Sequence, residues 1–274
     1  MNRARIIALL TSLLLSLPLA AQETNAMTVE QTVGTNALQM PDQLRRVPPP
    51  SKTASAKDLE MQADILRAEK NYADSLDYYR AAIKSHDTAV LENKAGIAEL
   101  QMQHLEDAKD RFEKAVHLDR TYPDALNNLG VAFYMKHNYK KAIKTYGKAI
   151  KERPGSSSFH SNLGSAYFAN KEFDKAFAEY GEAMEIDPEI FTRQSTSGVS
   201  AKLGSPEDRA KFHFVIAKVF AQRGDADNCI LYLRKAMEDG FPAIDDVYKE
   251  SEFAAIVKDP RFVTLMASRP EAVK

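Results

Sequence analysis

The stretch Leu126-Asn-Asn-Leu-Gly-Val-Ala-Phe-Tyr134 returns 34 residues later as His160-Ser-Asn-Leu-Gly-Ser-Ala-Tyr-Phe168. Four later pairs of matching residues keep the same spacing: Ala142/Ala176, Tyr146/Tyr180, Ala149/Ala183 and Pro154/Pro188. Self-similarity at a fixed period of this length is typical of stacked supersecondary units, each of which packs mainly against its neighbours. The sequence therefore predicts a repeat array rather than a single globular core.

Each repeated unit is predicted to contain two helices. In the unit 123–156, the segments 123–136 and 139–152 both carry apolar residues at the spacing of one helix face. Gly130 and Gly164 would lie inside the first helices, where glycine is about 1 kcal/mol less favourable than alanine. We expect that cost to be offset because the missing side chain lets the second helix approach closely.

Glycine, aromatic, alanine, aromatic, alanine and proline at these offsets resemble the tetratricopeptide repeat family, whose 34-residue units are helix–turn–helix pairs. The resemblance implies an all-α fold, a right-handed superhelical solenoid of antiparallel helix pairs. Four units carry it: residues 56–88, 89–122, 123–156 and 157–190. The last two match best and the first matches more weakly. The second has Glu99 and Arg120 where an aromatic residue and proline are usual.

The chain after residue 190 is predicted to depart from the period. Residues 191–209 read as an irregular connector, either a spacer between helical blocks or a functional loop. Residues 210–240 give a fifth, degenerate repeat, and residues 241–274 are expected to form a C-terminal helical cap. Such a cap would cover the apolar face that a last repeat otherwise exposes.

The N-terminal segment has the layout of an export signal. Residues 1–21 combine a short basic start, an apolar run and small residues at the end, as in a secretory signal peptide cleaved after Ala21. The alternative is an uncleaved anchor, but the run is short of the roughly 20 residues of a spanning helix and Pro18 interrupts it. Residues 22–55 are polar and contain Pro48-Pro49-Pro50, which predicts a disordered linker or, alternatively, a docking segment. We therefore expect a periplasmic or secreted protein without a membrane span after cleavage.

The charge balance argues against a nucleic-acid-binding protein, and the cysteine content excludes a disulfide-stabilised one. The 274-residue chain has 37 Lys and Arg against 38 Asp and Glu, a net charge of -1. Nucleic-acid binding depends on clustered cations that neutralise phosphates, so nucleic acid is not an expected partner. The single cysteine, Cys229, excludes an intramolecular disulfide framework, and its apolar neighbours predict a small buried core residue.

Motifs for catalysis, metal ions or cofactors are not found in the sequence. None of the six histidines belongs to a His-Glu-x-x-His pair or to a clustered metal-ligand spacing. No glycine-rich phosphate loop occurs, and Gly155-Ser-Ser-Ser reads as a turn before a helix rather than a nucleophile elbow. The sequence therefore predicts no enzyme activity, no cofactor and no metal.

The concave face, which the first helices of such an array line, is the expected binding surface. The candidate contacts are the first-helix residues of the two best units that packing within a pair does not require: Asn127, Asn128, Val131, Tyr134, Met135, Ser161, Asn162, Ser165 and Phe168. Asn128 aligns with Asn162, and an amide can donate to and accept from the backbone of an extended peptide. Tyr134 aligns with Phe168 and would add apolar contact area. The alternative is that the asparagines tie neighbouring first helices together and the aromatic rings pack between them.

Family members that hold the acidic tails of cytosolic chaperones use a carboxylate clamp of Lys, Asn and Arg residues. The resemblance places the five clamp positions here at Asn93, Ile97, Asn128, Ser158 and Asn162, and shifting by one unit in either direction does not supply the required set. A clamp is therefore not expected.

Two functional hypotheses follow. The first is a non-enzymatic, exported repeat scaffold that binds a protein or an extended peptide through its concave groove. The alternative is a structural or assembly component of the cell envelope that the N-terminal segment tethers.

Overall fold

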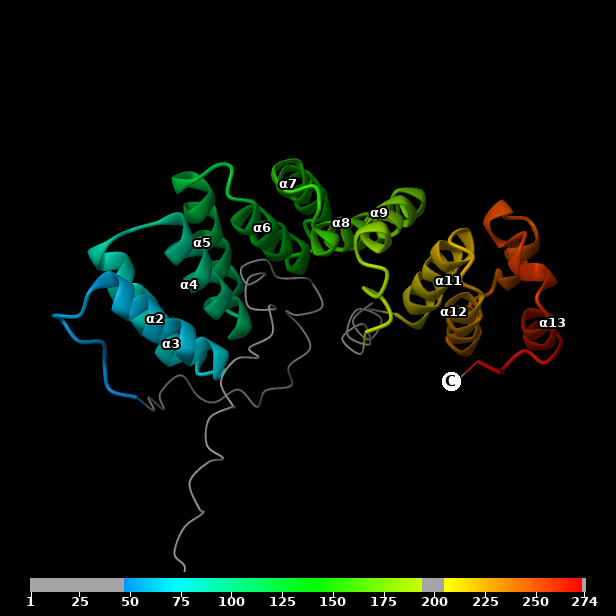
Figure 1. The fold of residues 1–274 in the computed structure, drawn as a ribbon, viewed down its shortest axis with the longest axis horizontal. Coiled ribbons are helices and arrows are strands. Elements are labelled where there is room, and N and C mark those ends of the chain that lie inside the picture. Colours follow the sequence, from blue (N-terminus) through cyan, green and yellow to red (C-terminus); the bar gives the residue numbers. More distant parts are fainter. Residues whose placement is uncertain (1–46, 194–204, 273–274) are drawn as a thin grey trace, which may run out of the picture.

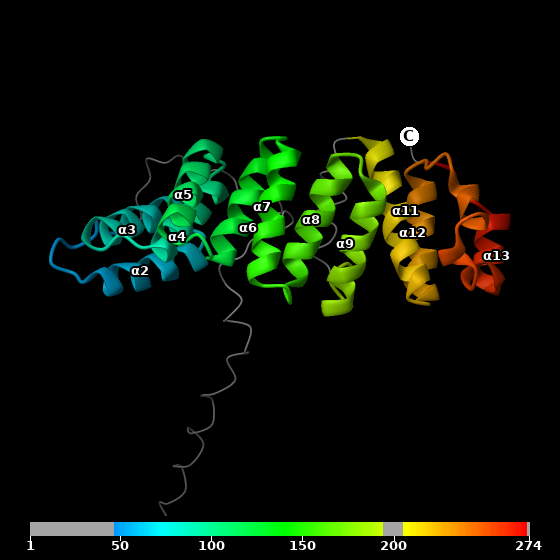
Figure 2. The same cartoon turned by 90° about the horizontal axis from the view of Figure 1, so that it is seen from above.

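A computed structural model describes residues 47–193 and 205–272, and all regular secondary structure in these ranges is helical. Five antiparallel pairs follow one another: α2 (Ala56–Ala68) with α3 (Tyr72–Ser85), α4 (Ala89–Gln101) with α5 (Leu105–Leu118), α6 (Pro123–Met135) with α7 (Tyr139–Glu152), α8 (Ser157–Ala169) with α9 (Phe173–Ile186), and α11 (Pro206–Gln222) with α12 (Ala226–Glu238). The pairs stack along an arch, in which α7 lies on the outer side of α6 (Figure 1), and they form a single row when seen from above (Figure 2). The fold is thus the predicted all-α solenoid.

An aromatic ring placed directly on a glycine sets the spacing within three of the pairs. A Cβ atom built on Gly130 would lie 2.5 Å from Cε1 of Tyr146, and one on Gly164 would lie 2.6 Å from Cδ1 of Tyr180. The same relation joins Gly96 to Phe112, at 2.6 Å. Real Cβ atoms do not come this close to a ring, so only glycine allows these helices to pack at this distance.

The turn within each pair has the same backbone conformation in all five pairs. Its second residue has a positive φ of 57–65° in the first four pairs, and in the fifth pair the residue is a glycine: Lys70, Gln103, His137, Lys171 and Gly224. The next amide closes the turn by donating to the carbonyl oxygen five residues earlier, for example Asn138 N to Phe133 O at 2.8 Å. This is a left-handed helix cap of the kind that usually contains glycine.

The fifth pair is offset from the fourth by the connector. Ser205 caps α11, which begins at Pro206, so the predicted connector of 191–209 extends four residues too far. Phe191 is buried, with its ring 5.3 Å from that of Tyr180. Residues 194–204 lie outside the described residues. Whether the connector is a spacer or a functional loop is therefore not decided by the structure.

Short helices follow the fifth pair over the range predicted to cap the array. They are η3 (Ile244–Tyr248), η4 (Ser251–Phe253), η5 (Ile256–Lys258) and α13 (Pro260–Ala267). Phe253, Ile256 and Phe262 are buried against the last pair, and the ring of Phe241 stacks on Phe214 with centroids 4.5 Å apart. Cys229 is buried in the same cluster, and burial raises the pKa of its thiol to about 12.

The predicted signal segment and most of the predicted linker lie outside the described residues. The last part of the linker, 47–55, lies beside the first pair: the hydroxyl of Tyr78 donates to the carbonyl oxygen of Pro48 at 3.0 Å, and Ala54 packs on the core of that pair. Among the described helices, none combines the length and the apolar character that crossing a membrane requires.

Replacing Gly130 with alanine is expected to destabilise the protein. Alanine is the better helix former, but its Cβ would overlap Tyr146, and overpacking of this kind typically costs about 1–3 kcal/mol. Gly147, on α7, is the matched control because a Cβ there meets no atom within 4 Å, so Gly147→Ala should stabilise the protein by about 0.5–1 kcal/mol. Urea unfolding followed by circular dichroism measures both changes. Equal effects of the two substitutions would contradict this account of the pair spacing.

Candidate functional site

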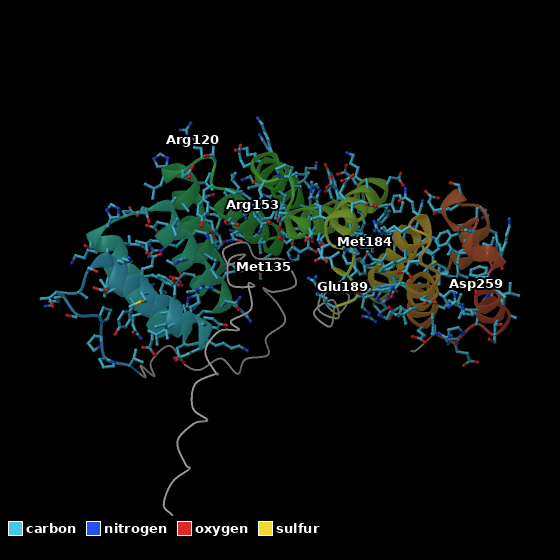
Figure 3. All side chains as sticks on the ribbon, viewed as in Figure 1. Arg120, Met135, Arg153, Met184, Glu189 and Asp259 are labelled. Atoms are coloured by element: carbon cyan, nitrogen blue, oxygen red, sulfur yellow. The ribbon has the colours of Figure 1, made fainter. Side chains whose placement is uncertain are left out.

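The nine predicted contact residues lie on the first helices α6 and α8, as expected. Seven of them are buried, with exposed fractions of at most 5%: Asn127, Asn128, Val131, Ser161, Asn162, Ser165 and Phe168. Tyr134 and Met135 are half-buried. Figure 3 shows Met135 toward the inner edge of the arch, whereas Arg120 lies at its outer edge.

The asparagines link neighbouring first helices. Nδ2 of Asn128 donates to Oδ1 of Asn93 on α4, and Nδ2 of Asn162 donates to Oδ1 of Asn127, both at 2.9 Å. Nδ2 of Asn127 donates in turn to Oδ1 of the adjacent Asn128 at 3.3 Å. The structure therefore contains the ties that the alternative interpretation describes. Contact of the same amides with an extended peptide stays a prediction.

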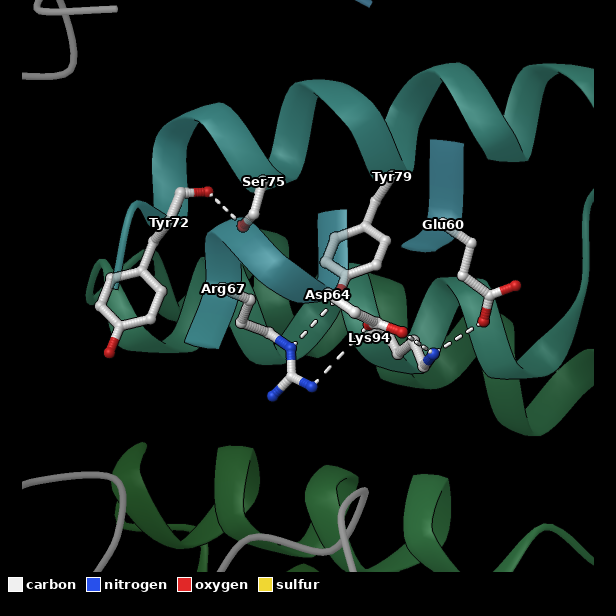
Figure 4. Close-up of polar contacts among 7 residues, drawn as sticks. All are labelled: Glu60, Asp64, Arg67, Tyr72, Ser75, Tyr79 and Lys94. Atoms are coloured by element: carbon white, nitrogen blue, oxygen red, sulfur yellow. Dashed lines mark hydrogen bonds and ion pairs between the residues drawn. The ribbon is translucent and has the colours of Figure 1, made fainter. Parts of the chain in front are cut away.

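The first such junction, between α2 and α4, is joined by an ion-paired lysine instead of an asparagine. Nζ of Lys94, on α4, lies 2.7 Å from Oε1 of Glu60 and 2.6 Å from Oδ2 of Asp64, both on α2 (Figure 4). The hydroxyl of Tyr79 donates to Oδ1 of Asp64 at 2.6 Å and accepts from Nε of Arg67 at 3.0 Å. Three successive junctions between first helices thus carry a polar tie. We name Glu60, Asn93, Lys94, Asn127, Asn128 and Asn162 the inner polar row.

The inner polar row could have been found from the sequence only in part. Lys94 lies 34 residues after Glu60, whereas Asn128 and Asn162 lie 35 residues after their acceptors. The donor occupies the sixth position of its repeat and the acceptor the fifth position of the preceding one. An alignment at a period of 34 pairs Asn128 with Asn162, whereas each of these two residues donates to the asparagine 35 positions before it.

The two aligned aromatic residues differ in their surroundings. The ring of Phe168 packs against Phe173 and Phe212, with centroids 5.2 and 5.9 Å away. Phe168 is therefore packed against α11 in the described structure, and contact of its ring with a ligand stays a prediction. Tyr134 is half-buried beside Tyr139, at 5.4 Å, and burial raises the pKa of its hydroxyl to about 12.

One group of side chains has the composition of a metal site. Ligand atoms of Glu99, His104 and Asp107 lie within 4.8 Å of one another at the turn between α4 and α5. The carboxylate of Glu99 already accepts from Nη2 of Arg80 at 3.0 Å and lies 3.0 Å from Nδ1 of His104. Because the guanidinium neutralises the buried carboxylate, the geometry explains the cluster as a structural ion pair, and we assign it no metal.

Comparison with known proteins identifies the repeats. Residues 123–156 and residues 157–190 each match a family model of the tetratricopeptide repeat, so the chain contains tetratricopeptide repeats. Proteins with these repeats generally mediate protein–protein interaction. Comparison with curated proteins gives no match.

Solved structures share the fold at low sequence identity. MamA residues 41 to the end, from Desulfovibrio magneticus RS-1, is 17% identical with a TM-score of 0.50, over 70% of this chain and 96% of that one. YrrB, described as a TPR protein with an unusual peptide-binding site, is 17% identical with a TM-score of 0.48, over 71% of this chain and 91% of that one. The thermophilic TPR protein TTC0263 from Thermus thermophilus is 16% identical with a TM-score of 0.46, over 74% of this chain and all of that one. At these identities the likeness to MamA supports the helical solenoid fold and no finer property.

The tie between Asn127 and Asn162 is expected to couple the stabilities of α6 and α8. In a double-mutant cycle of Asn127→Ala and Asn162→Ala, the free energies of unfolding should be non-additive by about 1 kcal/mol, the usual net value of one hydrogen bond. A second cycle of Asn127→Ala with Asn228→Ala, on α12, should be additive because those residues share no contact. Additivity in the first cycle, measured by urea unfolding, would show that the tie contributes nothing.

Proposed function

We propose that this protein is a non-enzymatic, exported scaffold that binds a protein partner, or an extended segment of one, on the concave face formed by its first helices. Tetratricopeptide repeats at residues 123–190 support the interaction role. The layout of residues 1–21 supports export. The inner polar row is the main observation in favour of the concave face as the binding surface.

A requirement for a stable fold does not by itself explain the polar side chains of the inner polar row. A net hydrogen bond contributes only about 0.5–1.5 kcal/mol, and replacing both partners by apolar groups of the same shape is often neutral or stabilising. The chain nevertheless keeps polar side chains at every junction from α2 to α8, including four asparagines that are almost fully buried. A row of amides suits a ligand with an exposed backbone, because each amide can both donate and accept. The face also has an apolar component in Tyr134 and Met135, which are half-buried at the C-terminal end of α6.

Chemical groups that would suggest catalysis are engaged in structural contacts. Within the described residues, the buried carboxylate of Glu92 pairs with Arg111 at 2.8 Å and with Lys114. Asp124 is held by both terminal nitrogens of Arg153 at 2.7 and 2.9 Å. These pairs join the two helices of one unit, so their charges are accounted for by packing. This supports a binding role over an enzymatic one.

A photo-crosslinking amino acid at position 135 is expected to capture the partner in extracts of the cell envelope. The same group at position 148, on the exposed side of α7, is the matched control and should give no adduct of the same mass. Because Met135 lies on the first helix α6 toward the inner edge of the arch and Lys148 is exposed on the second helix α7, the pair of positions separates the two faces of the array. Adducts with a different protein from position 148 alone, as opposed to an adduct between two copies of this chain, would place the partner on the outer face and refute the proposal.

Export predicts a defined new N-terminus. The protein recovered from the envelope or the medium should begin at Gln22, because Ala21 supplies the small residue that signal peptidases require before the cut. Mass spectrometry of the intact protein measures this directly. Ala21→Arg should block the cut and leave the longer chain. A protein that keeps residues 1–21 and remains in the cytoplasm would refute export and leave the binding proposal unaffected.

A further inference from the structure

Helix α7 has a strongly basic exposed side. It contains five lysines and one glutamate, a net charge of +4. Lys140, Lys144, Lys148 and Lys151 are all exposed and follow one another at steps of four or three residues, which places them on one side of the helix. Within the described residues, no carboxylate oxygen lies within 4.0 Å of these four ammonium groups. The basic side of α7 therefore lacks ion-pair partners within the described part of its own chain.

The second helix of the next repeat, α9, has the opposite charge at the same positions. It contains four acidic residues and one lysine, a net charge of -3. Three exposed carboxylates stand 34 residues after three of the lysines, in the pairs Lys140/Asp174, Lys148/Glu182 and Lys151/Glu185. Glu185 also contacts Arg223 of α11. The equivalent positions of α5 are Glu106, Lys114 and His117, a mixed set, so α5 shares neither the basic pattern of α7 nor the acidic pattern of α9.

Each of the two helices also has a glycine at the centre of its outer side. Gly147 and Gly181 occupy the same repeat position, and a Cβ built on either would meet no atom within 4 Å. Packing among the described residues therefore does not require these glycines, in contrast to Gly130 and Gly164. Glycine inside a helix is destabilising relative to alanine, so a benefit from outside the chain would account for both. Close approach of another backbone is such a benefit.

We propose that the outer sides of α7 and α9 are the contact surface for a second copy of this chain. The two copies pair about a two-fold axis that runs parallel to α7 and α9, midway between them and just outside their exposed sides. A half-turn about that axis places α7 of one copy on α9 of the other without changing height along the helices. Residues 34 apart lie at equal heights in equivalent repeats, so each lysine of the three pairs meets the carboxylate with which it is paired.

Symmetry doubles every contact of this arrangement. The surface is self-complementary, so α9 of the first copy meets α7 of the second in the same way, and six pairs of opposite charge form in all. Gly147 of each copy comes opposite Gly181 of the other, where the absence of side chains lets the backbones approach. The arrangement is closed, and it leads to a dimer rather than a filament.

A second copy fits this surface better than a flat anionic one. A membrane or polyanion broad enough to cover α7 would also approach the carboxylates of α9, one helix away, and would be repelled by them. The surface spans two helices of 14 residues, each about 21 Å long. An interface of that size is at the small end for specific complexes, so the dimer should be weak and sensitive to salt.

Sedimentation velocity of the purified protein over a range of concentrations tests the association. We expect a monomer–dimer equilibrium whose dissociation constant rises at least tenfold between about 0.01 M and 1 M salt, as the screening length falls from about 30 Å to about 3 Å. A protein that stays monomeric at its highest soluble concentration in low salt overturns the proposal. So does a monomer that instead binds anionic vesicles or polyglutamate through α7.

Charge reversal tests the pairing of the two helices. Lys148→Glu with Lys151→Glu should abolish self-association, and Glu182→Lys with Glu185→Lys should do the same, because each double variant places like charges opposite each other at four contacts of the symmetric dimer. Mixing the two variants should restore a dimer with an affinity within about threefold of the original, since every contact is again between opposite charges. The matched control is Lys57→Glu with Lys84→Glu, two exposed lysines of the first pair, which should leave association unchanged. Failure of the mixture to dimerise would overturn the proposed register.

The glycines provide a test that does not depend on charge. Gly147→Gln with Gly181→Gln should raise the unfolding midpoint of the monomer, because glutamine is the better helix former, while weakening dimerisation at least tenfold. Stability and affinity would then change in opposite directions, which a general loss of structure cannot produce. Unchanged affinity in this variant would overturn the close approach.

Discussion

An aromatic ring resting on a glycine backbone is the constraint on which the array depends. In the second, third and fourth pairs, the ring of Phe112, Tyr146 or Tyr180 occupies the space that a Cβ would fill on the opposing first helix. Because the contact is rigid and is repeated at the same position, successive pairs have the same internal geometry. Pairs of equal geometry stack in the same way, and this brings residues about one period apart on α4, α6 and α8 within hydrogen-bond reach. The inner polar row is thus a consequence of packing within each pair.

The first and fifth pairs lack the contact between an aromatic ring and a glycine. In the first pair Ala63 stands at the glycine position, and the hydroxyl of Tyr79 extends to Asp64, which also pairs with Lys94. In the fifth pair Ala217 takes the glycine position, and the row is not continued. Aromatic contacts replace it at that junction, where Phe212 of α11 lies 5.9 Å from Phe168 and 5.8 Å from Tyr180. Polar ties join the four regular units, and an apolar cluster joins the fifth.

The sequence predicts the solenoid well because the repeated residues are those that packing requires. Glycine, the aromatic residue, alanine and proline each occupy one position of the repeat and each have one structural role there. It predicts less where one residue type can serve two purposes. An asparagine on a first helix can tie two helices or bind a peptide, and its spacing is the same in both cases. The backbone conformation of the turns could not be predicted, since Lys70, Gln103, His137 and Lys171 adopt positive φ without any of the compositional preference that glycine would show. The burial of Phe168 depends on α11, which lies beyond the regular period.

The side chains on the inner and outer sides of the array are constrained in different ways. Residues on the inner side are held by contacts between repeats, so packing constrains their identity. Exposed charges on α7 and α9 contribute little to the stability of the monomer, so their opposed signs at three equivalent positions are not explained by folding. Two copies joined by these outer sides would have their concave faces directed away from each other. A dimer of that form presents two binding faces that cannot obstruct one another, and a partner with two accessible segments would gain avidity from engaging both. A scaffold that binds its partners on the inner side and itself on the outer side can therefore assemble without giving up any of its binding surface.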